Sequence, residues 1–335
     1  MANLVYSGKV IIRVLFLLML IVLFQVFSKS QEVNATHAAG SDMTYRCLGG
    51  NQYEVEVSFY RDCAGIDAPA VITVFYRSVS CGFNQNVTAT QVPNSEVEIS
   101  VPCSSSASTC NNGITTGIKK FIYRAVVNLP AACSDWVFSY SICCRNCSIT
   151  TIDDPCGNSS NLYVEAKLNN LIAPCNSSPA FSNNPIAFVC VGQNFSFNQG
   201  VYDADGDSLS YSLIAPKTSA TTSVQYLPPA TINEPIASST PFGLNAVTGD
   251  INFTPSQIQI GILAVLVQEF RNGQLIGSVI RDIQIYSTAC FNTLPVASGI
   301  NGSNSYSATI CPGQQLCFDI FTDDADANQT ITMTS

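Results

Sequence analysis

Three carboxylates at alternate positions have the spacing in this chain that most resembles a set of metal ligands. Asp203, Asp205 and Asp207 surround one glycine, and a looping backbone with this spacing can point several oxygens at one Ca²⁺ ion. The loop is not an EF-hand, because its sixth and twelfth positions are serine and isoleucine instead of glycine and glutamate. Glu269 and Asp282 are candidates to complete such a site, although no spacing rule connects them to it. The alternative is a polar surface turn, in which Asp and Gly are favoured.

This loop belongs to an imperfect internal repeat. The segment 189–197 recurs 121 positions later as 310–318, and Asp324 and Asp326 follow the second copy as the first carboxylates follow the first copy. The repetition of oxygen-bearing side chains adds support for calcium and leaves the plain turn open, and it makes Asp324 and Asp326 candidate Ca²⁺ ligands as well. We expect Ca²⁺ to raise the melting temperature of this part of the chain, and Asp205→Ala to abolish that increase.

Groups that could carry catalysis are sparse. The only histidine, His37, lies in a polar segment near the N-terminus, so a Ser-His or Cys-His pair has no base within a folded domain. The closely spaced cysteines at 143–147 could bind zinc, but no second cluster completes a tetrahedral set. Trp136 and Tyr140 could form a sugar-stacking platform, although the alternation around them favours packing within a sheet. We therefore predict that the chain is not an enzyme and has no cofactor other than Ca²⁺.

Charge and cysteine content indicate an exported protein. The net charge is −9 and only 11% of the residues are charged, so no basic surface is available to neutralise phosphates and nucleic acid is not a predicted partner. All fifteen cysteines lie beyond the first 30 residues. Such a cysteine content suits disulfide pairing in an oxidising exterior.

The first 30 residues have the pattern of a signal peptide. Lys9 and Arg13 supply the positively charged start of a signal peptide, and an uninterrupted apolar run, 14–24, follows them. This run is shorter than the roughly 20 residues that span a bilayer as a helix. The longer stretch 10–27 leaves an uncleaved membrane anchor as the alternative. Contact with a membrane is predicted only through this leader or through a C-terminal anchor beyond residue 335.

Apolar residues alternate with polar ones along most of the remaining chain. Period-two runs rich in Val, Ile, Tyr and Phe predict half-buried strands of antiparallel sheets, and only 162–172 shows, weakly, helical spacing. The predicted strands are 53–59, 71–76, 97–101, 121–127, 136–142, 188–190, 194–198, 208–214, 250–253, 262–270 and 277–285. The sequence therefore predicts an all-β, disulfide-rich protein of tandem antiparallel β-sandwich modules of the immunoglobulin-like type.

Proline- and asparagine-rich segments, together with the repeat, divide the chain into modules. The predicted organisation is a signal peptide at 1–30, a polar segment at 31–41, a cysteine-rich β domain at 42–173, a linker at 174–185, a β-sandwich at 186–286, and a linker with the truncated start of a second such module at 287–335. A module of about a hundred residues of short strands is typical of an immunoglobulin-like sandwich. We expect the chain to be the front end of a longer protein.

Cysteine parity favours one disulfide scheme. Pairing Cys175 with Cys190 and Cys290 with Cys311 joins each linker to the module that it introduces, and leaves an even number of cysteines in the first domain. Cys317 then awaits a partner beyond the end of the chain. The alternative, a bond between Cys190 and Cys290, leaves an odd number in the first domain.

Five phrases of the sequence can be compared with known families: Tyr60-Arg61-Asp62-Cys63-Ala64-Gly65-Ile66, Ser80-Cys81-Gly82, Trp136 with Cys143-Cys144-Arg145-Asn146, and residues 203–211 and 242–255. In the first three, the chain resembles the long secreted proteins of Bacteroidetes that end in a gliding-motility-associated sorting domain. In the last two, it is similar to cadherin-like and immunoglobulin-like bacterial surface modules. The resemblance implies export by the general secretory route and then the type IX system. It also implies calcium binding by inter-domain carboxylates, for which Asp203, Asp205 and Asp207 match the pattern. The usual linker rich in Asp and Asn before a proline is missing.

These observations predict a secreted or cell-surface structural or adhesion protein, whose modular β-sandwiches present a binding surface and which could serve gliding motility or surface attachment. The predicted partner is an extracellular surface, through a protein or glycan ligand that the sequence does not identify. Two alternatives remain open. The chain could be the non-catalytic spacer of an exported polysaccharide hydrolase or peptidase whose catalytic domain lies beyond residue 335, or its first domain could recognise carbohydrate.

Overall fold

The computed structural model describes residues 37–99, 107–157, 160–185, 188–290, 295–306, 308, 310, 313–326 and 331. The predicted signal peptide at 1–30 and Cys311 lie outside the described residues. Within the described ranges, no helix combines the length and the apolar character that crossing a membrane requires.

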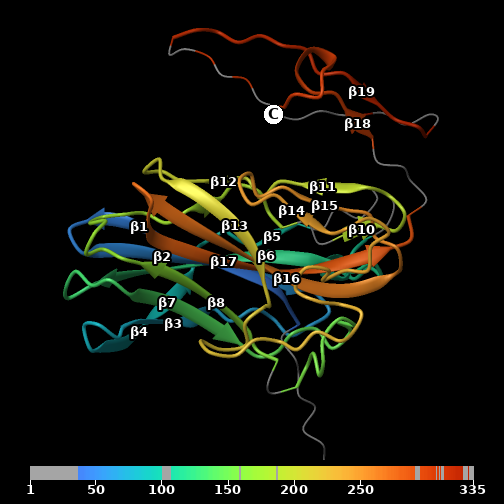
Figure 1. Ribbon diagram of the computed structural model, residues 1–335. Helices are drawn as coiled ribbons and strands as arrows, with labels where there is room; N and C mark the ends of the chain where they lie inside the picture. Colours follow the sequence, from blue (N-terminus) through green and yellow to red (C-terminus); the bar gives the residue numbers. More distant parts are fainter. Residues whose placement is uncertain are drawn as a thin grey trace, which may run out of the picture. The chain divides into compact units, whose positions relative to one another are not determined.

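The described chain is all-β, as predicted, and two short 3₁₀ turns accompany its strands (Figure 1). The strands of the first half are β1 (Ala38–Gly49), β2 (Gln52–Asp62), β3 (Val71–Ser78), β4 (Phe83–Gln91), β5 (Val97–Glu98), β6 (Ile118–Asn128), β7 (Trp136–Ile142) and β8 (Leu162–Leu168). Those of the second half are β9 (Ala180–Phe181), β10 (Phe188–Cys190), β11 (Phe195–Phe197), β12 (Val201–Tyr202), β13 (Ser208–Ile214), β14 (Gly243–Leu244), β15 (Ile251–Phe253), β16 (Gln259–Arg271), β17 (Gln274–Thr288), β18 (Val296–Ala297) and β19 (Thr322–Asp323). The 3₁₀ turns are η1 (Thr109–Asn111) and η2 (Ile300–Gly302).

Eight of these strands form a closed path of backbone hydrogen bonds. The order is β1-β2-β6-β4-β3-β7-β8-β17, and β17 pairs back to β1, with every neighbouring pair antiparallel. Closure leaves none of these strands with a fully open edge along the path, which removes the usual template for unwanted strand pairing. β16 and β13 continue the sheet from the other edge of β17.

The closure depends on the length of β17. One edge of this strand pairs with β16, and the other pairs first with β8 through Gly277–Val279, then with β1 through Arg281–Ile283, and last with β10 in parallel. A strand of 15 residues extends about 50 Å at 3.3 Å per residue, which is enough to border several partners in turn. The hairpin that begins it turns at Asn272 and Gly273, both at positive φ, as the Asn-Gly pair predicts.

The core is continuous across the predicted boundary at 174–185. One cluster of buried side chains contains Phe59 and Trp136 from the predicted first domain, and Val265 and Val279 from the predicted second domain. Trp136 is fully buried and Tyr140 is 3% exposed, so both pack within the sheet, as expected, and neither forms a sugar-stacking surface. The strands of 42–173 and 186–286 thus share one sheet and one core, which differs from the expected separate sandwiches. Strand pairing between segments far apart in the sequence leaves no periodic pattern in the sequence. The prediction of two separate domains therefore rested on the composition of the linker alone.

Other sequence expectations differ from the fold at particular places. Residues 162–172, which showed weak helical spacing, contain β8, whose seven residues are almost all buried because both faces are covered. β1 begins at Ala38, inside the predicted polar segment 31–41, because Ala38–Ser41 are buried against neighbouring strands. The carbonyl of His37 accepts a hydrogen bond from the Asp62 amide at 3.1 Å. The lone histidine therefore belongs to the folded unit, which corrects its assignment to a segment outside the fold.

Six disulfides link the described cysteines, and the predicted linker staples are not among them. The bonds are Cys47–Cys175, Cys63–Cys110, Cys81–Cys133, Cys143–Cys144, Cys147–Cys156 and Cys190–Cys290. Cys175 and Cys190 thus have partners other than each other, so the predicted Cys175–Cys190 and Cys290–Cys311 bonds are wrong. Parity failed because it assumed that each domain keeps its own cysteines, whereas Cys47–Cys175 joins β1 to the predicted linker. Disulfides of this number are typical of an oxidising, extracellular environment.

The internal repeat reappears as structure. In the first copy β9 pairs with β12 immediately before Asp203, and in the second copy β18 pairs with β19 immediately before Asp324. The turn that follows is also the same, since the amide of Asp205 donates to Asp203 Oδ1 at 3.0 Å and that of Asp326 donates to Asp324 Oδ1 at 2.8 Å. The two copies therefore share this turn, which short-range hydrogen bonding can specify without the rest of a domain. The repeated segment itself differs, because residues 195–197 form β11 whereas residues 316–318 form no strand.

Candidate cation site

The aspartate loop between β12 and β13 is organised by its first residue. Oδ1 of Asp203 accepts hydrogen bonds from the backbone amides of Asp205 and Asp207, both at 3.0 Å, and Gly206 takes a φ of 81° between them. An aspartate that binds the amides two and four positions later closes a tight polar turn. Oδ2 of Asp203 faces the other way and is free for a further partner.

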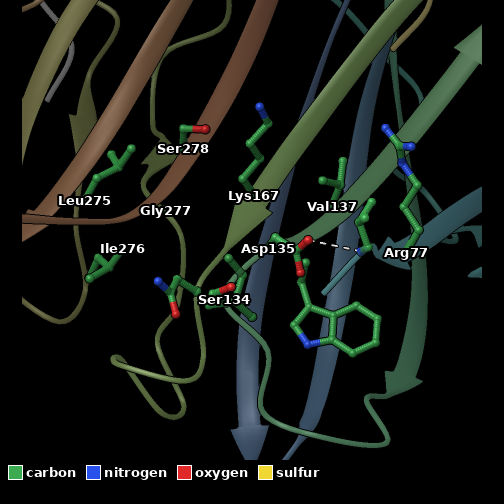
Figure 2. A pocket seen from close by; sticks show the side chains of 13 residues that line it. Arg77, Ser134, Asp135, Val137, Lys167, Leu275, Ile276, Gly277 and Ser278 are labelled. Atoms are coloured by element: carbon green, nitrogen blue, oxygen red, sulfur yellow. Dashed lines mark hydrogen bonds between the residues drawn. The ribbon is translucent and has the colours of Figure 1, made fainter. Parts of the chain in front are cut away.

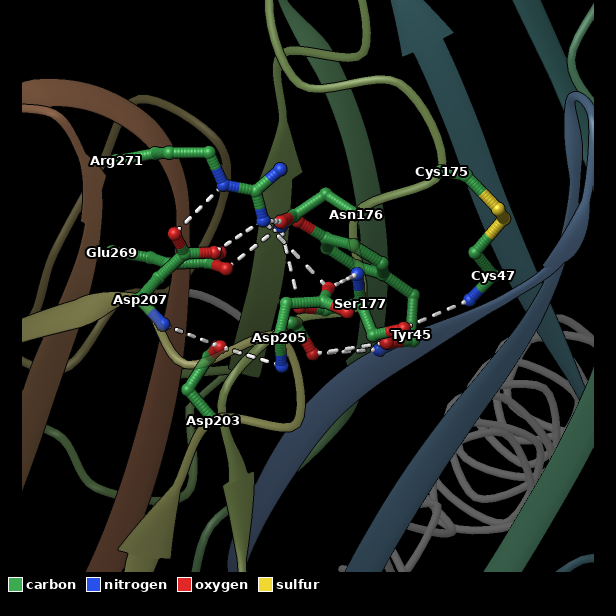
Figure 3. Close-up of polar contacts among 11 residues, drawn as sticks. Tyr45, Cys47, Cys175, Asn176, Ser177, Asp203, Asp205, Asp207, Glu269 and Arg271 are labelled. Carbon is green, nitrogen blue, oxygen red and sulfur yellow. Dashed lines mark hydrogen bonds and ion pairs between the residues drawn. A yellow bond between two sulfur atoms is a disulfide. The ribbon is translucent and has the colours of Figure 1, made fainter.

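Glu269 from the distant strand β16 meets this loop. It pairs in register with Leu209 of β13, directly after the loop, and its side chain is fully buried. Ligand atoms of Asp203, Asp207 and Glu269 all lie within 4.8 Å of one another (Figure 3). From the sequence, Glu269 was a candidate ligand, but no spacing rule connected it to the aspartate loop. The antiparallel pairing of β13 with β16 brings it there.

Two carboxylate oxygens in this cluster are buried without a hydrogen-bond partner. They are Oε2 of Glu269 and Oδ2 of Asp203. The other oxygen of Glu269 accepts a hydrogen bond from Asn176 Nδ2 at 2.8 Å. Burying a carboxylate oxygen without a donor or a cation costs free energy, and two such oxygens in one cluster require a positive group or a proton between them.

A neighbouring glycine leaves space for Glu269. A Cβ atom on Gly277 of β17 would lie 2.4 Å from Glu269 Oε2 and 2.9 Å from the hydroxyl of Tyr45. Only a glycine permits the carboxylate to lie this close to the β17 backbone. The packing of β16 against β17 therefore fixes where the unpartnered oxygen points.

Electrostatics separates the roles of the carboxylates. Burial, and then the charge of Asp203, raise the pKa of Glu269 to about 9. Arg271 has the opposite effect on Asp207: its guanidinium donates to both carboxylate oxygens, at 2.7 and 2.5 Å, and lowers the pKa of that aspartate. Arg271 thus balances the charge of Asp207, whereas the raised pKa leaves Glu269 protonated at neutral pH unless a cation takes the place of the proton.

The third aspartate of the sequence motif lies outside the cluster. Oδ2 of Asp205 accepts a hydrogen bond from the Ser177 amide at 2.7 Å and lies 3.9 Å from Arg271. Asp282, the other sequence candidate, is bound by Arg145 instead. The predicted ligand set therefore changes: Asp203 and Asp207 are brought together, Glu269 joins them, and Asp205 and Asp282 serve other partners. Alternate spacing alone could not distinguish these aspartates, because they differ only in where the turn points them.

Two residues that the sequence did not indicate support the site. Asn176 donates to Glu269 and accepts from Arg271 at 2.6 Å, and it directly follows Cys175, whose disulfide to Cys47 holds this segment against β1. Arg271 ends β16 one residue before the Asn-Gly turn. The sequence does show an arginine two residues after Glu269 and next to a hairpin turn. This arginine indicates a role in the site only when Glu269 is known to lie beside the aspartate loop.

The geometry of the cluster fits a hard cation. Two ligands on opposite sides of Ca²⁺ are about 4.8 Å apart, since each Ca–O bond is about 2.4 Å long, and the three carboxylates lie within that separation. All three ligand groups are oxygens, the donor type that Ca²⁺ takes from proteins. The second copy presents Asp324 and Asp326, but among the described residues no glutamate completes its cluster.

Comparison of the chain with protein-family models, with curated proteins and with solved structures finds no match. The resemblance to gliding-motility-associated surface proteins therefore stays a prediction.

Proposed function

We propose that this is an extracellular or surface-attached structural or adhesion protein, in which Ca²⁺ held by Asp203, Asp207 and Glu269 fastens the aspartate loop to β16. The observation that carries the calcium assignment is the pair of buried, unpartnered oxygens on Asp203 and Glu269. A cation between them would replace the missing hydrogen bonds and would displace the proton that Glu269 otherwise holds.

Calcium fits the site better than the other common metal ions. Zinc prefers Cys and His ligands in a tetrahedral arrangement, and this cluster offers only carboxylates. Mg²⁺ requires a nearly ideal octahedron and gives up its water reluctantly, whereas Ca²⁺ accepts an irregular set in which one ligand comes from a loop and another from a strand. Calcium is therefore the ion that we assign to the site.

The structural or adhesive role is supported by how the fold is held together. The closed path of strands is braced by disulfides that connect β1 to the 174–185 segment and β10 to the residues after β17. Such bonds constrain the unfolded chain and resist reduction outside the cell. A rigid, oxidised β framework is suited to displaying loops, which is where binding residues are usually found.

Calcium binding is tested by isothermal titration calorimetry and by thermal unfolding of the full chain, with Ca²⁺ and with a chelator. We expect Ca²⁺ to bind and to raise the melting temperature, and Glu269→Gln and Asp203→Asn each to abolish both effects. Asp205→Asn is the matched control, because it lies in the same loop yet points to Ser177, and it should retain binding. Absence of heat and of stabilisation at millimolar Ca²⁺ would contradict the assignment, as would loss of binding in the control alone.

The adhesive role is tested separately. Beads coated with the chain should be retained on polysaccharide-coated glass more strongly than albumin-coated beads, and a chelator should reduce that retention. Equal retention of the two kinds of bead would contradict an adhesive role for this part of the protein without affecting the calcium assignment.

A further inference from the structure

A cavity of about 250 Å³ lies where the ends of β3 and β8 meet the starts of β7 and β17 (Figure 2). One row of paired residues crosses all four strands: Arg77 faces Val137, Val137 faces Lys167, and Lys167 faces Ser278. Directly paired residues of antiparallel strands point to the same face of a sheet. Figure 2 accordingly shows Val137 between the side chains of Arg77 and Lys167.

Of the two cations of this row, Arg77 is available to a ligand, and Lys167 shares its carboxylate partner with a second lysine. Arg77 is half-buried, yet its guanidinium makes no hydrogen bond or ion pair with any residue that the structure describes. Lys167 lies 3.3 Å from Glu165, but Glu165 has a closer partner in Lys217 at 2.7 Å. The Cα atoms of Arg77 and Lys167 are two strand spacings apart, about 10 Å, so both long side chains can reach one anionic group above Val137.

The cavity also contains one carboxylate, which does not neutralise Arg77. The oxygens of Asp135 accept hydrogen bonds from the hydroxyls of Ser78 and Ser80 and from the amides of Val79 and Ser80. Its lone pairs are therefore directed into the turn after β3. The two basic side chains leave the cavity with a net positive charge.

The remaining lining is partly apolar and partly hydrogen-bonding. Leu275 and Val137 provide apolar contact, and Ser134, Asn169 and Ser278 provide hydroxyl and amide groups. The volume of about 250 Å³ lies just below the roughly 300 Å³ at which ligand sites usually begin, so the cavity has room for one ring-sized ligand at most. A guanidinium recognises a carboxylate through two parallel hydrogen bonds, while hydroxyls and amides recognise the hydroxyls of a sugar.

We infer that this cavity binds a hexuronic acid unit of an acidic polysaccharide, with its carboxylate between Arg77 and Lys167. The inference goes beyond the proposed function, because it would hold equally for an adhesin and for the spacer of an enzyme. A peptide C-terminus is the less favoured carboxylate. The strands at the cavity are already paired, Leu168 with Gly277 and Lys167 with Ser278, so a peptide finds no open edge to extend.

The chain contains a single tryptophan, Trp136, and it lines this cavity. Its fluorescence therefore reports on this site and on the adjoining core, where Trp136 contacts Tyr76 and Phe83. We expect galacturonic or glucuronic acid to change the fluorescence of the full chain saturably. The methyl ester of galacturonic acid, which keeps the ring but loses the charge, should bind about 10-fold more weakly or worse, since a hydrogen bond to a charged group contributes about 1.5 to 3 kcal/mol.

Arg77→Gln should weaken binding of the acid by about 10-fold or more and leave the weak binding of the ester unchanged. Lys167→Met, at a half-exposed side chain, is a second variant that preserves folding. Arg46→Gln, at an exposed arginine paired with Glu54, is the matched control and should bind like the unchanged chain.

Failure of both acids to bind at 10 mM would overturn the inference. So would equal binding of acid and ester, an unchanged affinity in Arg77→Gln, or a preference for sulfate or for a peptide carboxylate over the uronic acids. Because none of these variants touches Asp203, Asp207 or Glu269, this outcome is independent of the calcium test.

Discussion

The guanidinium of Arg145 donates to both carboxylate oxygens of Asp282, at 2.8 and 2.6 Å, and both side chains are almost completely buried. This pair joins the segment after β7 to the middle of β17. Beside it, the Asn146 amide donates to Asp62 at 3.1 Å, and the Tyr286 hydroxyl donates to the same carboxylate at 2.8 Å. The two cysteine-flanked phrases that carry the resemblance, at 60–66 and 143–146, thus meet each other and β17 in one buried polar network.

Arg145→Met should lower the free energy of unfolding by about 3 to 5 kcal/mol, because it leaves the Asp282 carboxylate buried without a partner. Urea unfolding followed by circular dichroism measures the change. Arg46→Met removes an exposed ion pair with Glu54 and should cost less than about 1 kcal/mol. Equal effects of the two substitutions would show that the buried pair has no special role. Adding Asp282→Leu to Arg145→Met should recover part of the loss.

Peptide mapping of the unreduced protein should recover Cys47–Cys175 and Cys190–Cys290, and no Cys175–Cys190 peptide. Replacing Cys47 and Cys175 together by serine should lower the free energy of unfolding by up to about 5 kcal/mol, because a long loop is no longer closed in the unfolded chain. Cys317 is exposed and unbonded, so Cys317→Ser should leave stability unchanged. A Cys175–Cys190 peptide would refute the observed pairing.

Without divalent cations, the stability of the fold should decrease as the pH rises from about 5 to 8. The pKa of Glu269 is raised from 4.5 to about 9 in the folded chain, so the folded state holds a proton that the unfolded state has lost. The stabilisation is complete below pH 4.5 and is lost as the pH approaches 9, with a slope of at most about 1.4 kcal/mol per pH unit. Urea unfolding at several pH values should show this decrease in the unchanged chain and a flatter profile in Glu269→Gln. Identical profiles would refute the explanation.

Gly277→Ala should lower the free energy of unfolding by about 1 to 3 kcal/mol, because the added Cβ would meet Glu269 Oε2 and the Tyr45 hydroxyl. It should also weaken Ca²⁺ binding in calorimetry by displacing Glu269. Gly243→Ala is the matched control, since the nearest atom to its Cβ is the Asn252 carbonyl oxygen at an ordinary 3.5 Å. If Gly277→Ala binds Ca²⁺ as tightly as the control, the position of Glu269 is not what determines the site.

Most of the strands follow directly from local pattern. The alternation at 121–127 and 136–142 predicted β6 and β7, and Asn272-Gly273 predicted the β16–β17 hairpin, because period and turn chemistry are properties of short segments. Among the long strands, β1, β4 and β8 were not predicted. The residues of β8 are buried on both faces, and a strand covered on both sides loses the alternation that identifies it.

The aspartate loop of the candidate site could likewise be predicted from the amino-acid sequence. The turn at Asp203–Asp207 is specified by hydrogen bonds within a few residues, and for that reason the second copy repeats it. Glu269 and Asn176 are separated from the loop by many residues, and only strand pairing and the Cys47–Cys175 bond bring them to it.

The amino-acid sequence by itself determined that this protein is built from strands, that its cysteines suit an oxidising exterior, and that an aspartate turn occurs twice. Only the tertiary structure decided that one path of strands closes through β17, which cysteines are joined, and which carboxylates share a site. The reason is physical. Side-chain alternation and turn hydrogen bonds act over a few residues, whereas strand partners, disulfides and buried ion pairs are chosen by how distant segments pack together.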